Sequence, residues 1–535
     1  MHDVHSRHPL ASPPPKSLAS ATLYLNPSNS EEYNSKPISN YSITLPQTHR
    51  SPPMARPEFI IIPLPGMGHL IPAVELATRL VSRDERVAVS LLIMTSTFDQ
   101  ISSYIQSLHQ TFTATGDRVH VVQLPGPQER PDPASKSFMP DMLQNYKPIV
   151  KKAAEDLAKN VQLMGLILDP FCSDYISIAH ELQIPTYIFF TSGAAFLSLM
   201  LHFQSLRDDH KVDLKELTSD PDGDVEIPGF KNRVPNKVLP PLFQLDSMAD
   251  FFLNHSMRFR KTRGIIVNTS EELESYPIQI LSNDPKIPPI YPAGPIINQN
   301  ARKGAEAGPD GNNASIMGWL DDQPPGSVVF LCFGSMGSFN EEQVREVAKA
   351  LEKSGHRFLW ALRRPPSASE RFEPPSEYDD LSDVLPEGFL DRTTSIGKII
   401  GWAPQVQILS HPAVGCFVSH CGWNSTLEGL SLGVPIAAWP MYAEQQANAF
   451  ELVKEMGMAV EVRMDYTWDH RKKSSNFIVQ SDEIEKAIRE IMDEKSPVRK
   501  KVKEIAESNR KATAEGGSTY TALGRFIDDA FKNIQ

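Results

Sequence analysis

The chain has 535 residues and a formal net charge of -12. Its length predicts more than one domain, each with its own hydrophobic core. The acidic balance argues against a nucleic-acid binder, because affinity for phosphate backbones rests on clustered Lys and Arg. A small neutral substrate fits better. The 4 cysteines are sparse, so buried thiols are expected rather than disulfides or metal ligands. A reducing cytosol suits such thiols.

The N-terminal stretch over 1–53 is rich in Ser, Pro, Asn and His and has no central apolar segment. It matches neither a secretory signal nor a transit peptide, so a disordered extension is expected. No run elsewhere reaches the roughly 18 consecutive apolar residues that a membrane helix needs. We therefore expect a soluble, cytoplasmic protein without a membrane span.

An alternation of strands and helices follows the extension. An apolar strand at 59–62 leads through a Gly-bearing loop to His69 and into an amphipathic helix. Further strands are predicted at 87–94, 119–124, 165–168, 186–190 and 264–268, with helical patterns between most of them. This alternation predicts an α/β domain over 54–297, in which helices flank a parallel sheet.

A second α/β series follows residues 298–314, which are rich in Gly and Asn and predict a linker. Within the second domain, 315–512, strands are predicted at 328–333, 357–362 and 415–418, and a helix at 341–353. The segments 364–387 and 464–477 are expected to be loops. Helical patterns fill 481–512 and 517–532, and the last of them lies in a C-terminal segment, 513–535.

The stretch from Trp402 to Gln445 has the order of an anion site. A strand at 415–418 turns at 420–424 into a helix predicted to begin at Ser425. Unpaired amides at a helix N-terminus point outward and favour negative charge, so a diphosphate fits there, and Trp402 offers a flat face for a base. The alternative is structural, because Ser425 and Glu428 also match a capping box. His420 and the tryptophans also suit purely structural roles.

This stretch, without a gap, resembles the nucleotide-sugar signature of plant family 1 UDP-glycosyltransferases, which glycosylate secondary products. The resemblance implies a GT-B fold, in which two doubly wound Rossmann-like domains face a cleft and the final helix packs back on the N-terminal domain. It implies that Trp402 stacks on uracil, that Ala403 and Gln405 lie beside the base or ribose, and that Glu428 holds the ribose diol. His420, Asn424, Ser425 and Ser335 would grip the phosphates, and Trp423, Glu444 and Gln445 would meet the sugar. In the family, a Gln at the last position usually accompanies UDP-glucose. Relatives usually start just before the first strand, which makes Met54 an alternative start.

His69 and Asp169 are the candidate catalytic pair. A histidine has an unperturbed pKa near 6.5 and can take a proton at physiological pH. Asp169 ends the strand at 165–168, and adjacent parallel strands bring their C-terminal ends to one edge of the sheet. The structural alternatives are a loop-bonding histidine and an N-cap aspartate. The resemblance gives His69 the role of catalytic base and Asp169 that of the carboxylate orienting it. Direct attack by the acceptor hydroxyl on an α-linked sugar would invert the configuration at the anomeric carbon and give a β-glucoside.

The acceptor is a small hydrophobic molecule with a hydroxyl group, by the same resemblance. Features outside the signature resemble a subgroup acting on flavonoids, other phenolics and terpenoids, so a flat phenolic is the first expectation and a triterpenoid the second. Candidate wall residues, which also suit a core, are Phe171, Phe190, Ser192, Phe196, Met142 and Met336. The scheme needs UDP-glucose as donor and no metal or other cofactor, and the enzyme is expected to act as a monomer.

Rival interpretations remain. The acidic turn at 220–224 fails the calcium-loop template, because its Gly is misplaced and Lys231 stands at the twelfth position. A dinucleotide fingerprint is disfavoured, since Ile71 replaces its third glycine and no acid ends the second strand. Neither Gly-rich loop has the ending of a P-loop. Another UDP-sugar, C-glycoside formation and a nucleotide-sugar-binding regulator without turnover stay open.

Overall fold

The protein is described by a computed structural model over residues 56–95, 99–114, 118–129, 131, 135, 137–244, 246–298, 313–366, 374–469 and 474–534. The predicted extension over 1–53 lies outside these residues, as does most of the predicted linker. Helix α10, Asn313–Asp321, includes the last two residues of that predicted linker.

The first sheet has seven strands in the order β3-β2-β1-β4-β5-β8-β9, and every pair of neighbours is parallel. The strands are β1 (Glu58–Ile62), β2 (Ala88–Ile93), β3 (Val119–Gln123), β4 (Leu163–Leu168), β5 (Thr186–Phe190), β8 (Ile265–Val267) and β9 (Ile290–Pro292). Of these, β9 was not predicted. At the centre, Ile62 of β1 pairs with Leu168 of β4, so these strands end side by side.

The second sheet has six strands in the order β12-β11-β10-β13-β14-β15, again all parallel. The strands are β10 (Val328–Cys332), β11 (Arg357–Ala361), β12 (Gly397–Ile400), β13 (Val414–Ser419), β14 (Ile436–Ala438) and β15 (Ala459–Glu461). Two antiparallel pairs stand apart from the sheets. They are β6 (Asp224–Val225) with β7 (Val234–Pro235), and β16 (Trp468–Asp469) with β17 (Ser474–Ser475), which lies in a segment expected to be a loop.

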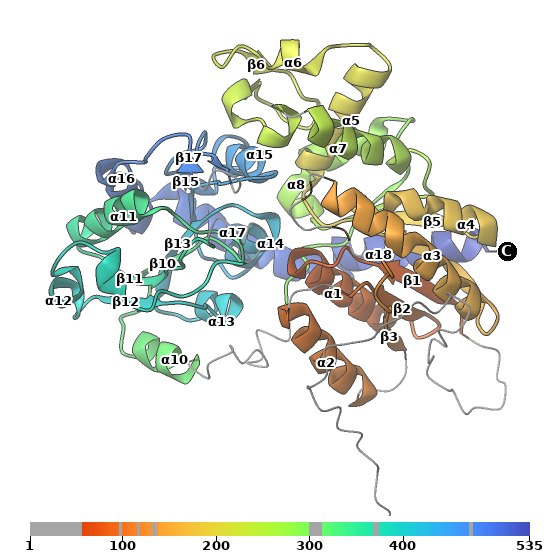
Figure 1. Ribbon diagram of the computed structural model, residues 1–535, viewed down its shortest axis with the longest axis horizontal. Coiled ribbons are helices and arrows are strands. Elements are labelled where there is room, and N and C mark those ends of the chain that lie inside the picture. The colour runs from red at the N-terminus through yellow and green to blue at the C-terminus, as the bar shows by residue number, and fades with distance from the viewer. Residues whose placement is uncertain are drawn as a thin grey trace, which may run out of the picture. The chain divides into compact units, whose positions relative to one another are not determined.

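Helices connect the strands in both halves (Figure 1). Those of the first half are α1 (Met67–Arg83), α2 (Asp99–Ala114), α3 (Phe138–Ala158), α4 (Ile176–Leu182), α5 (Ala194–Asp208), α6 (Leu214–Leu217), α7 (Asp246–Phe259) and α8 (Glu271–Asn283). Those after α10 are α11 (Glu341–Ser354), α12 (Phe389–Thr393), α13 (Gln405–Leu409), α14 (Trp423–Ser431), α15 (Gln445–Phe450), α16 (Ser481–Met492), α17 (Pro497–Thr513) and α18 (Ser518–Lys532). Short helical turns are η2 (Pro170–Tyr175), η3 (Asn236–Val238), η4 (Pro241–Gln244), η5 (Leu381–Asp383) and the π-helix η6 (Glu451–Glu455).

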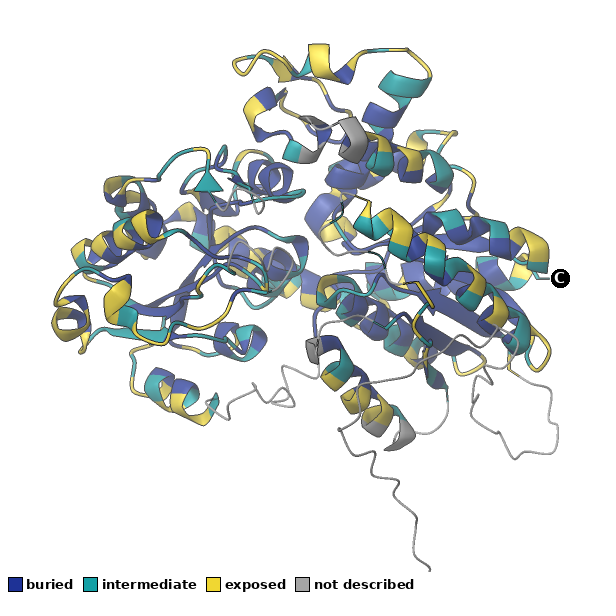
Figure 2. Cartoon of the chain, viewed as in Figure 1, coloured by how far each residue is buried: buried dark blue, intermediate teal, exposed yellow. Residues whose placement is uncertain are grey.

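Burial explains why the strands formed near-continuous apolar runs in the sequence. The strands β1, β2, β4, β5, β10 and β13 are buried at every position, as expected for parallel strands covered by helices on both faces. Figure 2 shows buried sheets and helices whose outer sides are exposed. The predicted α/β class with two parallel sheets is confirmed.

The helical patterns predicted over 481–512 form two helices. The helix α16 ends at Met492, and Pro497 opens α17 at its first turn, where proline's missing N–H costs no helical hydrogen bond. Periodicity alone did not separate the two, because both keep an apolar face.

The C-terminal helix α18 packs into the core of the first sheet. The ring of Phe526 stacks on Phe59 of β1 with centroids 5.3 Å apart, and it also meets the rings of Tyr187 and Tyr291 edge-on. Figure 1 shows the blue α18 among the red to yellow elements of the first half. The domain boundaries drawn from sequence and the cleft stay predictions.

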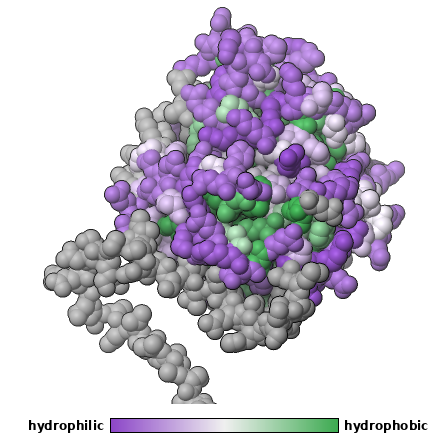
Figure 3. All heavy atoms as spheres, turned by 90° about the vertical axis from the view of Figure 1, so that its right-hand side faces the viewer, coloured by the Kyte–Doolittle hydropathy of each residue, from purple (hydrophilic) through white to green (hydrophobic). Residues whose placement is uncertain are grey.

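Three further observations concern the cysteines, the length of the helices and the surface. All four cysteines are free and buried, as predicted. Within the described ranges, no helix combines the length and apolar character that a membrane crossing requires. The face in Figure 3 is largely hydrophilic, with hydrophobic residues gathered near its centre.

Candidate active site

The side chains of His69 and Asp169 meet at the C-terminal edge of the first sheet. His69 lies in the first turn of α1, just after β1, and Asp169 directly follows β4. The imidazole Nδ1 lies 2.7 Å from Asp169 Oδ2. Because a carboxylate only accepts hydrogen bonds, Nδ1 carries the proton and Nε2 keeps a lone pair. The two side chains meet because β1 and β4 are neighbouring strands that end side by side.

Asp169 makes two contacts, one with His69 and one with the start of η2. Its Oδ1 accepts the backbone N–H of Phe171 at 3.0 Å and caps η2, while Oδ2 holds His69. The residue is 3% exposed. A carboxylate fixed at both oxygens keeps the imidazole in one tautomer and orientation.

The pKa of His69 is raised above its ordinary value of 6.5. Burial lowers it, but the charge and hydrogen bond of Asp169, together with the charge of Glu444, outweigh that effect. Thr191 Oγ1 also lies 3.3 Å from His69 Nδ1. Sequence reasoning missed Thr191, since a threonine after a strand carries no signal by itself.

The helix α14 begins at Trp423, two residues before the predicted start at Ser425. The extended Gly422 is its N-cap, and the carbonyl of Gly422 accepts the N–H of Thr426 at 2.9 Å. Cys421 has a φ of 61°, which lets the chain turn sharply out of β13. The exposed amides of the helix start therefore lie closer to His420 than predicted.

His420 is held between two glycines. A Cβ at Gly334 would lie 2.7 Å from its Nε2, and one at Gly422 would lie 2.6 Å from the same atom. Burial lowers the pKa of His420 to about 4, and its buried Nδ1 has no hydrogen-bond partner among the residues that the structure describes. At neutral pH this ring is an uncharged hydrogen-bonding group.

Ser425 and Glu428 do not form the alternative capping box, because both lie inside α14. The side-chain amide of Gln405 bridges them, donating from Nε2 to Ser425 Oγ at 2.9 Å and to Glu428 Oε2 at 2.6 Å. Three residues expected around the ribose and phosphates thus form one polar cluster.

Trp402 follows β12, at the C-terminal edge of the second sheet. Its ring is half-buried, and the guanidinium of Arg363 lies over it at 5.6 Å. Arg363 also donates to the carbonyl of Ser335 at 2.9 Å. Ser335 is exposed and Ala403 is half-buried, so the three predicted base and phosphate contacts are accessible.

Trp423 and Asn424 reach the first half of the molecule. The indole Nε1 of Trp423 donates to the carbonyl of Asn268 at 2.7 Å, and Asn424 Nδ2 donates to the carbonyl of Gly68 at 2.8 Å. The helix start expected to bind the diphosphate therefore touches the residue preceding His69. Asn268, at the end of β8, had no sequence signal.

Glu444 and Gln445 lie at the start of α15. Gln445 is 3% exposed, and its Oε1 accepts the N–H groups of Met441 at 2.9 Å and Tyr442 at 3.0 Å. Burial raises the pKa of Glu444, against the effects of its hydrogen bonds and the nearby His69. Glu444 thus lies close enough to His69 to link the two halves electrostatically.

The candidate acceptor residues divide into three groups. Phe171 meets the His69 ring at 5.5 Å and stacks on Phe251 at 6.0 Å, whereas Phe190 and Phe196 are buried against each other in the core. Ser192, Met142 and Met336 are partly buried. Sequence reasoning missed Phe251, because apolar residues on a helix usually indicate core.

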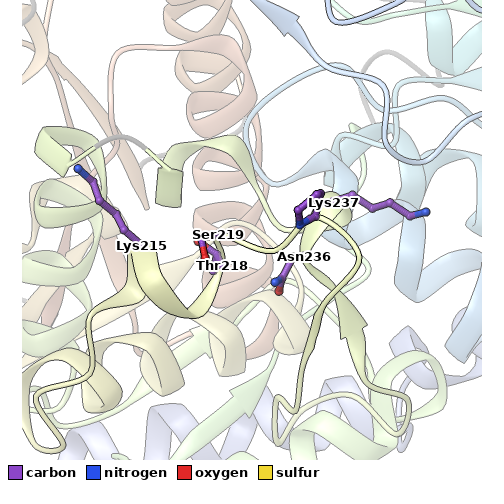
Figure 4. A pocket seen from close by; sticks show the side chains of 6 residues that line it. Lys215, Thr218, Ser219, Asn236 and Lys237 are labelled. Carbon is purple, nitrogen blue, oxygen red and sulfur yellow. The ribbon is translucent and has the colours of Figure 1, made fainter.

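A surface cavity lies apart from all of these residues (Figure 4). Its lining consists of Lys215, Thr218, Ser219, Pro221, Asn236 and Lys237. The two lysines extend in opposite directions in Figure 4, so they do not converge on one ligand. Next to it, the backbone N–H of Asp222 bonds Asp220 Oδ1 in the acidic turn. The described residues contain no group of three His, Cys, Asp or Glu side chains suited to a metal ion.

The site combines an imidazole held by a carboxylate at one sheet edge with a helix N-terminus that touches this edge from the other half. In a protein with two parallel sheets flanked by helices, this arrangement defines a transferase of nucleotide-activated groups. Comparison with known proteins specifies the class. The family model "UDP-glucoronosyl and UDP-glucosyl transferase" matches residues 143–500. UDP-glucose flavonoid 3-O-glucosyltransferase 6 of Fragaria ananassa is 48% identical over 477 residues, covering 88% of this chain and 98% of that relative.

Solved structures of UDP-glycosyltransferases are also similar to this chain. UGT71G1 of Medicago truncatula complexed with UDP-glucose has a TM-score of 0.78 and 40% identity, covering 89% of this chain and 98% of that one. UGT2 of Phytolacca americana complexed with UDP-2fluoro-glucose and pterostilbene has a TM-score of 0.74 and 33% identity, with 89% and 100% covered. The chain belongs to the plant family 1 UDP-glycosyltransferases and is a hexosyltransferase of GT-B fold, as predicted.

Proposed function

We propose that the protein is an inverting UDP-glucose-dependent O-glucosyltransferase that acts on a hydroxyl of a small plant phenolic and gives a β-glucoside. The observation that carries the proposal is the 2.8 Å hydrogen bond from Asn424 to the carbonyl of Gly68. It brings the helix start that suits a diphosphate next to the residue bearing the candidate base.

In the proposed reaction, Nε2 of His69 takes the proton of the acceptor hydroxyl as its oxygen attacks the anomeric carbon. The bond between that carbon and the diphosphate oxygen breaks, and UDP leaves from the opposite face, so an α-linked sugar becomes a β-glucoside. Asp169 accepts from Nδ1 at 2.7 Å and stabilises the imidazolium that forms. The imidazole is thus oriented before the acceptor hydroxyl reaches it.

The donor site uses the cluster around α14. We assign the uracil to Trp402, Ala403 and Gln405, and the ribose diol to Glu428. His420, Asn424, Ser425 and Ser335 take the diphosphate, whose developing charge the helix N-terminus supports. Glu444 and Gln445 take the sugar hydroxyls, and Gln445 favours glucose. The indole N–H of Trp423 is already donated to the carbonyl of Asn268, and its backbone N–H bonds the carboxyl of Glu444.

A phenolic acceptor is supported by the aromatic side chains beside His69. Phe171 carries a ring next to the imidazole, and Phe251 and Phe252 continue this aromatic surface. A phenol, with a pKa near 10, asks less of the base than an alcohol does. The flavonoid relative and the pterostilbene complex support this choice, and a triterpenoid alcohol is the second candidate.

The deciding experiment screens UDP-glucose, UDP-galactose and UDP-xylose against flavonols, stilbenes and triterpenoid alcohols, with product mass and UDP release as readouts. We expect UDP-glucose with a phenol to give the largest turnover and an acid-labile O-glucoside of β configuration. An acid-stable product would indicate C-glycosylation. UDP binding without release of UDP in any pairing would favour a non-catalytic regulator.

A further inference from the structure

The indole of Trp423 belongs to the donor helix but packs on the first half of the molecule. Trp423 is the first residue of α14 and is 3% exposed. Its Nε1 donates to the carbonyl of Asn268 at 2.7 Å, and its ring carbons Cζ2 and Cη2 approach within 2.8 Å of the point where a Cβ on Gly193 would stand. A side chain larger than hydrogen at position 193 would exclude the indole.

The receiving surface around Gly193 is fixed. Gly193 is the N-cap of α5 with a φ of -77°, which any residue adopts, so its small size rather than its backbone freedom admits the indole. The buried carboxylate of Glu274 accepts the N–H groups of Ala194 at 2.9 Å and Ala195 at 2.8 Å. Its Oε1 also lies 2.9 Å from the same Cβ point. The start of α5 is therefore held in place and cannot easily move to make room for both the indole and a larger side chain at position 193.

The next residue provides a second point of attachment. Asn424 donates to the carbonyl of Gly68 at 2.8 Å, one residue before His69. Two successive residues of α14 thus bond to the segment carrying the base and to the end of β8. Two separate attachments fix both the distance and the direction between two bodies, which a single hydrogen bond does not.

We propose that Trp423 is a positioning residue: its indole, seated on Gly193 and bonded to Asn268, sets the spacing between the diphosphate-binding helix start and His69. The inference rests on the proposed function, since it concerns the alignment of donor and base. It differs from the expectation that Trp423 meets the sugar hydroxyls, because it gives the indole N–H a bond to Asn268 instead.

Trp423→Phe removes the indole N–H and the two ring carbons nearest Gly193, and Gly193→Ala pushes against an intact indole. We expect each to lower kcat about 10- to 100-fold, the order of loss that a misplacement of about 1 Å causes, while the Kd of UDP changes less than about threefold. In the double variant the added methyl occupies the space that the indole left. Gly193→Ala should then lower kcat no more than about twofold relative to Trp423→Phe.

Trp439→Phe is the matched control. Trp439 is fully buried, and in the described part of the chain its Nε1 finds no hydrogen-bond partner. The same substitution therefore removes ring volume without removing a described bond between the halves. We expect a lower Tm and a nearly unchanged kcat.

Three results would overturn the inference: unchanged kcat in Gly193→Ala, a loss of UDP affinity that accounts for the whole effect, or strictly multiplicative effects in the double variant. The first needs no tryptophan variant to fold. Absence of glucosyl transfer by the wild-type chain would instead reject the proposed function.

Discussion

Asp169 holds His69 with one carboxylate oxygen while the other oxygen caps the next helical turn. The distances are 2.7 Å from Oδ2 to His69 Nδ1 and 3.0 Å from Oδ1 to the N–H of Phe171. The cap fixes the carboxylate and the carboxylate fixes the imidazole, so the candidate base is oriented before any substrate binds.

Asp169→Asn should lower kcat roughly 10²- to 10⁴-fold and move the acid limb of the pH profile to lower pH. The carboxylate raises the pKa of His69 against the effect of burial, and the base works only when neutral. Activity of the wild type is therefore lost as pH falls through a raised pKa, and removing the negative charge lowers that pKa. The measurement is kcat/KM against pH.

The matched control is Asp174→Asn, which removes a nearby carboxylate that pairs with Lys147 and Arg258 instead. The acid limb of its pH profile should stay in place.

The protonation of His69 also affects the stability of the fold. Ion pairing with His69 stabilises the wild type fully below pH 6.5 and less as pH rises through the raised pKa, so Asp169→Asn should lose more Tm at acid than at alkaline pH. An acid limb that stays unmoved in Asp169→Asn would assign it to another group.

His69→Ala should abolish nearly all O-glucosylation, a loss of at least ~10²-fold, while UDP still binds. The predicted phosphate and uracil contacts lie on the second half, and the backbone carbonyl of Gly68 that meets Asn424 is retained. Isothermal titration with UDP and product mass after long incubation test both parts. Full activity of this variant would remove His69 from the role of base.

Much of this architecture was readable from the sequence because the signals were local. Apolar strands such as β1 and β4 are buried on both faces, and strand ends in a parallel sheet share an edge. That rule alone brought His69 and Asp169 together. Within the signature from Trp402 to Gln445, the side chains of Gln405, Ser425 and Glu428 form one hydrogen-bonded cluster.

What the sequence did not contain were the contacts between the two halves. Trp423 was predicted at the sugar, yet its N–H bonds Asn268, some 155 positions away in the chain. The helix start was misplaced because Ser425 imitates a cap, whereas Gly422, with no side chain to signal it, is the N-cap. Such pairings depend on how two folded surfaces meet, and no local pattern encodes that.

Gln445→His should weaken the use of UDP-glucose and lower Tm. Gln445 Oε1 accepts two backbone N–H groups, those of Met441 and Tyr442, and leaving buried donors unpaired costs roughly 1–3 kcal/mol each. Gln445→Glu separates the two roles, because it keeps an acceptor for the turn but loses the amide N–H. We expect Gln445→Glu to retain more Tm than Gln445→His while still losing preference for UDP-glucose over UDP-galactose. Unchanged donor preference in both would show that the sugar is read elsewhere.

Gly334→Ala should weaken UDP binding by displacing His420. The added Cβ would stand 2.7 Å from Nε2 of a fully enclosed ring, at a φ of +75°. Backbone strain at such a φ costs of order 1–3 kcal/mol by itself, so a control must carry the same strain without the contact. Gly355→Ala provides it, with a φ of +68° and open space around the Cβ. Both variants should lose Tm, but only Gly334→Ala should raise the Kd of UDP, and equal UDP affinities would show that His420 is not part of the diphosphate site.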